Sequence, residues 1–183
     1  MRRFAFCLAV PALAAAAALP APTRPHEPVP PAAMAALFRA AIGEAAARPY
    51  PRCLGLLPPA PPPEKGPIAE TLLPIDSIAD PPAAVMRAVA ADVRRAHPWS
   101  ACAGDSVTYA SGERGICGFK VRATGERAMF WALRDASLTS DSTVTGRVLY
   151  WGCALGSIGE RRCDARRPGR KWVRGRCTLL WQE

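Results

Sequence analysis

Six cysteines follow residue 21 of this 183-residue chain, and they constrain its fold more than any other feature. They are Cys53, Cys102, Cys117, Cys153, Cys163 and Cys177. An even set with no CxxC pair is typical of a disulfide framework in an exported protein. The chain has only two histidines, His26 and His97, too few for ordinary mixed Cys/His metal sites. We therefore expect three disulfides, no metal and no cofactor.

The pairing of these cysteines is open, because six cysteines allow fifteen connectivities. Two short intervening turns favour Cys153 with Cys163 and Cys102 with Cys117. Elimination then leaves Cys53 with Cys177.

The first 21 residues have the layout of a secretory signal peptide. Arg2 and Arg3 precede an apolar run over residues 4–19, which ends at small residues where a signal peptidase could cut. The run is shorter than the roughly 20 residues of a membrane span, and Cys7 lies too early in it for lipid attachment. Arginine is abundant and asparagine is absent, which is typical of a GC-rich bacterial genome. We expect export to the periplasm or medium of a Gram-negative-type bacterium, with no membrane span after cleavage.

The first half of the remaining chain predicts two helices separated by proline-rich segments. Residues 22–31 read as an extended tether. Apolar residues at helical spacing predict a helix over residues 32–47, which Pro49 ends, and a second over residues 82–96, which Asp80 caps. Repeated prolines at about 55–82 predict an irregular surface loop between them.

The second half changes to the period of β-strands. A short strand is expected at residues 51–56, and alternation predicts another at 119–122. Residues 128–133 are apolar at successive positions, which predicts a central strand. Residues 147–153 and the last segment supply further strands. We expect one α+β domain over residues 32–183, in which the two N-terminal helices pack on an antiparallel, curved meander of about four to six strands.

The end of the chain carries a resemblance. A turn followed by Lys171, Trp172 and Val173, closing on Leu180 and Trp181, resembles the final hairpin of cone-shaped NTF2-like or cystatin-like α+β domains. It is also similar to small exported bacterial proteins of unknown function. The resemblance covers about the last 40 residues, and the proline-rich insertion and the disulfides depart from the NTF2-like pattern. It implies a fold and no particular activity.

No residue is assigned a catalytic role. The stretch Gly104-Asp105-Ser106-Val107 is similar to the Gly-Asp-Ser block of certain serine esterases, but no histidine follows His97 to activate Ser106. We expect Ser106 to lie in a turn that enters a strand, and His97 to end the second helix. The alternative is a small secreted hydrolase that uses carboxylates in a cone-shaped pocket. The candidate carboxylates are Glu113, Glu126, Asp135 and Asp141.

The basic C-terminal segment is the remaining candidate site. Its alternation predicts a strand whose outer side is charged, and a turn at residues 167–170 would place Arg161 opposite Arg176. Trp172, Arg161, Arg174 and Arg176 would then share one exposed face. In one interpretation this face only solubilises the domain, with a cation-π contact on Trp172. In the other it docks an anionic envelope component, such as lipopolysaccharide or an acidic protein. We expect a monomeric, non-catalytic domain that does not bind nucleic acid.

Overall fold

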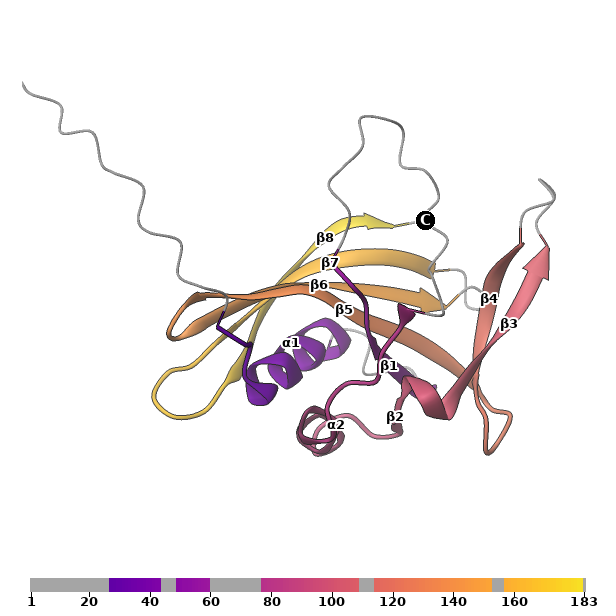
Figure 1. Ribbon diagram of the computed structural model, residues 1–183, viewed down its shortest axis with the longest axis horizontal. Helices are drawn as coiled ribbons and strands as arrows, with labels where there is room; N and C mark the ends of the chain where they lie inside the picture. Colours follow the sequence, from indigo (N-terminus) through magenta and orange to yellow (C-terminus); the bar gives the residue numbers. More distant parts are fainter. Residues whose placement is uncertain (1–26, 44–48, 60–76, 109–113, 153–156, 183) are drawn as a thin grey trace, which may run out of the picture.

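The structure is a computed structural model in which residues 27–43, 49–59, 77–108, 114–152 and 157–182 are described, with the backbone alone at 105–108, 114–117 and 157. These stretches form two α-helices, a short 3-10 helix and eight strands (Figure 1). The bounds are α1 Pro31–Gly43, β1 Arg52–Leu56, α2 Ala83–Ala90, β2 Ala96–Pro98, η2 Trp99–Ala101, β3 Cys102–Thr108, β4 Arg114–Val121, β5 Arg127–Ser140, β6 Thr143–Gly152, β7 Ser157–Arg166 and β8 Val173–Gln182. The α+β class is confirmed.

The strands form one mixed sheet. β5, β6, β7 and β8 pair antiparallel in chain order. β1 is parallel to both β2 and β5, so the expectation of an antiparallel sheet is wrong on this side. A parallel pair needs a crossover of a dozen or more residues, and the long segment between β1 and β2 supplies one. β5 lies between β1 and β6 with Met129–Leu133 buried, which confirms the predicted central strand.

Helix α1 packs against one face of the sheet, which we call the inner face (Figure 1). The inner face is formed by Met129, Trp131, Leu133, Val144, Val148, Tyr150, Cys163 and Ala165. α1 begins with Pro31, which suits the first helical position because its missing N–H would be unpaired there. Gly146 of β6 lets the helix approach closely, since a Cβ there would lie 2.9 Å from a methyl group of Leu37 and 2.9 Å from one of Leu133.

Helix α2 is shorter than the sequence predicts. It ends at Ala90, and Arg95 then adopts a left-handed backbone with φ of 61°. The Arg95 carbonyl accepts a hydrogen bond from the Arg52 N–H at 3.0 Å, which begins the pairing of β1 with β2. Sheet pairing therefore overrides helix propensity here. His97 lies in β2 beside Cys53 and not at a helix end.

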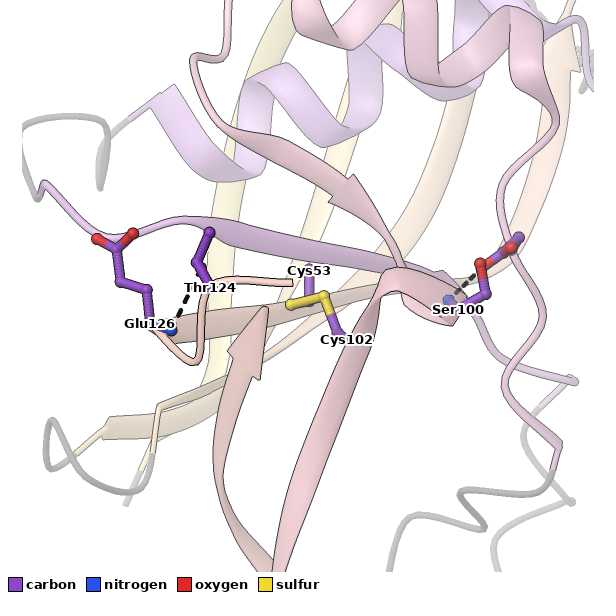
Figure 2. Close-up of a disulfide and its surroundings, with 6 residues drawn as sticks. Cys53, Ser100, Cys102, Thr124 and Glu126 are labelled. Carbon is purple, nitrogen blue, oxygen red and sulfur yellow. Dashed lines mark hydrogen bonds between the residues drawn. A yellow bond between two sulfur atoms is a disulfide. The ribbon is translucent and has the colours of Figure 1, made fainter. Parts of the chain in front are cut away.

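Asp80 does not cap α2. The residue before the helix is Pro82, and no side chain caps it. Instead, the Oδ1 atom of Asp80 accepts a hydrogen bond from the Ser100 N–H at 2.7 Å, which ties Asp80 to η2 (Figure 2).

Two disulfides lie in the described residues, and neither is a predicted pair. Cys53 bonds to Cys102 and joins β1 to the start of β3 (Figure 2). Cys163 bonds to Cys177 between β7 and β8, where the two residues are directly opposite with Cα atoms 4.1 Å apart. All three predicted pairs are therefore wrong, because Cys53, Cys102, Cys163 and Cys177 each have a different partner. Cys153 and the side chain of Cys117 lie outside the described residues.

The face of the sheet opposite α1, which we call the outer face, carries a second apolar cluster. Its centre is aromatic: the Phe130 ring lies 5.0 Å from both Trp99 and Phe119, measured between centroids. η2 and β4 supply Trp99 and Phe119, so these two elements cover this end of the outer face. The sheet is thus buried on both faces at this end.

Candidate anion-binding site

A cavity of about 680 Å³ lies where three segments that are distant in the sequence meet. The segments are the end of α1, the turn after α2 and the start of β8, and one residue of β1 joins them. The described lining residues are Arg39, Ile42, Gly43, Arg52, Asp92, Val93, Arg94, Trp172, Val173 and Arg174. Ligand pockets commonly have volumes of about 300 to 1,000 Å³, so the cavity is large enough for a small molecule.

Local structure explains how these side chains converge. Arg39, Ile42 and Gly43 are spaced i, i+3 and i+4, so they lie on one side of α1. Trp172 directly precedes β8, and Val173 and Arg174 are the first two residues of that strand, so three consecutive residues bring the chain to the cavity.

Arg39 ties the three segments together. Its Nη1 donates to the Asp92 carboxylate at 2.7 Å, and its Nη2 makes a long hydrogen bond of 3.5 Å to the Trp172 carbonyl. The Arg39 side chain is 23% exposed and that of Asp92 is 59% exposed, so the ion pair lies at the edge of the cavity. Because Asp92 is engaged by Arg39, its charge compensates mainly that one guanidinium.

Arg52 is the buried cation of the site. The residue is 6% exposed, and its Nη1 donates to the Tyr50 carbonyl at 2.9 Å. Burial lowers the pKa of Arg52 below its usual value, and the nearby positive charge of Arg95 lowers it further. Positive charge is therefore unfavourable at this position.

Arg94 and Arg174 are exposed at the cavity and make no ion pair with a carboxylate in the described part of the chain. Gly43 leaves room for the Arg174 side chain, since a Cβ at position 43 would lie 2.9 Å from the Arg174 Nη1. Two exposed guanidiniums therefore lie at the mouth of the site.

The cavity is strongly basic. Its described lining carries four arginines and one aspartate, a formal charge of +3. Guanidinium groups donate in a planar fork that matches carboxylate and phosphate oxygens. The arrangement can bind an anion, and the one described carboxylate of the lining, Asp92, is paired with Arg39.

The structure divides the four residues that the sequence placed on one hairpin face. Trp172 and Arg174 both line the cavity, but Trp172 is 8% exposed, so its predicted exposure is wrong. Its ring receives a cation-π contact from Arg167, 5.5 Å from the centroid. Arg161 lies over the Tyr150 ring on the inner face.

The register explains the error. Arg161 is opposite Leu179 and not Arg176. Residues 167–172 connect β7 to β8, so the loop is longer than the predicted turn at residues 167–170. Two irregularities also shift the pairing of β7 with β8. Arg176 lies at one of them, where its N–H donates to the Asp164 carboxylate at 2.5 Å. Arg161 and Arg176 therefore do not line the cavity.

Sequence reasoning missed Arg39, Arg52 and Arg94. Arg94 lies within the span predicted as the second helix, and Arg39 and Arg52 stand alone in an alanine-rich helix and a short strand. No local signal marks them, since only the packing of α1, α2 and the sheet brings them together.

A second charged cluster lies on the outer face around Glu160. This glutamate is fully buried, and its carboxylate accepts hydrogen bonds from Arg134 Nε at 2.8 Å, Arg147 Nη2 at 2.5 Å and Trp181 Nε1 at 3.2 Å. Asp135 lies 3.7 Å from Arg147. Glu160 lies on β7, and its three hydrogen-bond donors lie on β5, β6 and β8, so these contacts join four adjacent strands.

The hydrolase alternative gains no support from the positions of its carboxylates. Glu126 pairs with Arg95, Asp135 lies beside Arg147, and neither they nor Asp141 line the cavity. Glu113 lies outside the described residues. The described residues contain no group of three or more His, Cys, Asp or Glu side chains that could hold a metal ion.

Ser106 lies within β3, paired with Ile116, so the turn expected there is wrong. Gly104 and Ser106 flank an irregularity in this pairing. The side chain of Ser106 is outside the described residues.

A scan against protein-family models found no matching family, and searches of curated proteins and of solved structures found no significant match. Among the described helices, none is long and apolar enough to span a membrane. The fold and the cavity therefore define the chain as an α+β domain with a basic pocket, and the functional argument depends on that pocket.

Proposed function

We propose that this chain is an exported, disulfide-stabilised domain that binds an anionic ligand in the cavity between α1, the turn after α2 and β8. The observation that carries the proposal is the excess of arginine over carboxylate among the described residues of one half-open cavity. The signal-peptide layout of residues 1–21 and the two disulfides support export, since disulfides persist in oxidising compartments. In the periplasm or medium, the ligand would be a soluble anion or an anionic group of an envelope component.

Arginine geometry favours this role over simple solubility. Arg39 is held by Asp92 and the Trp172 carbonyl, and Arg52 is held by the Tyr50 carbonyl. A ligand therefore meets guanidiniums that are already positioned, which reduces the entropy lost on binding. Arginines that only solubilise a protein need no such support.

Magnitudes indicate which arginines matter most for affinity. Unit charges about 4 Å apart attract by roughly 1 kcal/mol in water and by roughly 4 kcal/mol at an effective dielectric constant near 20. Arg94 and Arg174 are exposed, so the attraction of each for an anion should lie nearer the lower value. Since about 1.4 kcal/mol corresponds to a tenfold change in affinity, removal of either charge should weaken anion binding by roughly tenfold.

The test is the binding of inorganic pyrophosphate, measured by isothermal titration calorimetry on the mature, oxidised protein. The double variant Arg94→Glu with Arg174→Glu should weaken binding by at least a hundredfold. The charge-matched control reverses Arg87 on α2 and Arg162 on β7, which are exposed and do not line the cavity. The control should bind within a fewfold of the parent protein. Equal losses in the two double variants would mean that only net charge matters, and the proposal would fail.

A further inference from the structure

The cavity has an apolar part as well as a basic one. Each of its three main segments contributes one arginine together with an apolar side chain: α1 has Ile42, the turn after α2 has Val93, and the chain at the start of β8 has Trp172, the residue before the strand. These three residues are at most 8% exposed and form the floor. Val173 also lines the cavity and is 44% exposed, so apolar surface continues to its mouth.

The charge of the site exceeds that of a carboxylate. Among the described lining residues there are four arginines and one aspartate, and that aspartate is already paired with Arg39. A carboxylate ligand would bring a single negative charge. A phosphate monoester carries about −1.5 to −2 near neutral pH and presents three strong acceptor oxygens, so it compensates more of the excess and accepts from more than one guanidinium.

The size of the cavity excludes a bare inorganic anion as a complete occupant. A volume of about 680 Å³ lies within the range of pockets that enclose whole small molecules. A phosphate group at the arginines would leave the exposed side chain of Val173 uncovered. Covering it with apolar atoms is favourable in proportion to the apolar area removed from water.

We propose, on the basis of the anion-binding function above, that the ligand is a phosphate monoester carried on an apolar body. The phosphate lies between Arg94 and Arg174 at the mouth, with Arg39 behind it, and the apolar body lies along Trp172 and Val173. This chemistry is shared by soluble phosphate esters and by the phosphorylated headgroup of a lipid.

The experiment compares three soluble probes by calorimetry at fixed pH and ionic strength: inorganic phosphate, hexyl phosphate and hexanoate. Hexyl phosphate should bind at least tenfold more tightly than either of the others. Equal affinity for hexyl phosphate and inorganic phosphate would overturn the apolar part while leaving the anion site intact. Equal affinity for hexyl phosphate and hexanoate would overturn the phosphate assignment. No binding of any of the three probes would refute the proposed function itself.

Two variants separate the two halves of the site. Val173→Ser removes exposed apolar surface and keeps every charge, so it should reduce the preference for hexyl phosphate and leave inorganic phosphate binding unchanged. Arg174→Gln should weaken both by roughly tenfold, and Arg87→Gln on α2 serves as the control that should alter neither. If Val173→Ser weakens both phosphates equally, the apolar contact is refuted.

A fourth arm distinguishes the source of the phosphate. Vesicles of phosphatidylcholine with phosphatidic acid are sedimented with the protein, and vesicles of phosphatidylcholine alone are the reference. Co-sedimentation that requires phosphatidic acid and is lost in Arg174→Gln supports a lipid ligand. Binding of hexyl phosphate without co-sedimentation supports a soluble ester. Co-sedimentation that Arg174→Gln leaves unchanged would show that lipid binding does not use the cavity, and would overturn its assignment as the lipid phosphate site.

Discussion

Replacement of Glu160 by glutamine tests whether the buried carboxylate holds the four antiparallel strands together. The change keeps the size of the side chain and removes its charge. Both carboxylate oxygens are used, one by Arg134 and the other by Arg147 and Trp181. A glutamine amide must place its NH₂ group against at least one of these donors, whichever way it is oriented.

The expected cost follows from the burial of the group. Glu160 is fully buried, and the side chains of Arg134 and Arg147 are 16% and 31% exposed. Removing one partner of a buried ion pair typically costs 3 to 5 kcal/mol. Because the arginines are partly exposed and glutamine keeps one acceptor oxygen, we expect Glu160→Gln to lower the free energy of unfolding by about 3 kcal/mol, the lower end of this range. With an m value of about 2 kcal/mol per molar for a domain of this size, the urea midpoint should fall by roughly 1.5 M.

The measurement is urea unfolding of the oxidised protein at pH 7, followed by tryptophan fluorescence. The matched control is Glu126→Gln, because Glu126 also pairs with an arginine but its side chain is 42% exposed and that of Arg95 is 46% exposed. A surface pair of this kind contributes about 1 kcal/mol or less. If the two variants lower stability by the same amount, the argument from burial is wrong.

Two further predictions concern the sheet. Reduction or Cys→Ser replacement of the Cys163–Cys177 bond, which closes a loop with a sequence separation of 14, should lower the free energy of unfolding by roughly 3 kcal/mol. Peptide mapping under non-reducing conditions should recover this pair and the Cys53–Cys102 pair. A map that shows other partners for these cysteines would refute the assignment. Gly146→Val should cost about 2 kcal/mol or more, because the added side chain meets Leu37 and Leu133 where α1 touches β6; an unchanged urea midpoint would show that α1 is not held closely against the sheet.

The sequence predicted best those elements whose signal is local. The apolar run at 128–133 identified the central strand β5, and helical spacing identified α1. The errors concern long-range pairing. The parallel pairing of β1 with β5 and the bond between Cys53 and Cys102 depend on which distant segments meet in the fold, and the spacing along the chain does not encode this. The early end of α2 has the same cause, since the pairing of β2 with β1 competes with the helix.

The basic C-terminal segment shows why charge density along a sequence differs from charge density in space. In β7, Arg161 packs on Tyr150 of the inner face, while Arg162 lies directly opposite Arg147. Arg167 packs on Trp172 in the connecting loop. Of the eight basic residues after position 160, only Arg174 lines the cavity.

The other cavity arginines come one at a time from elements whose local sequence gives no reason to group them. Arg39 is on α1, Arg52 on β1 and Arg94 in the turn after α2. A guanidinium on an open strand face attracts anions through a field that salt screens over about 8 Å at physiological ionic strength. An arginine that lines a half-open cavity is screened less, because solvent and salt have less access to it. Charge at the cavity should therefore determine affinity for a small anion, whereas the rest of the basic segment should contribute mainly to the salt-sensitive rate of encounter.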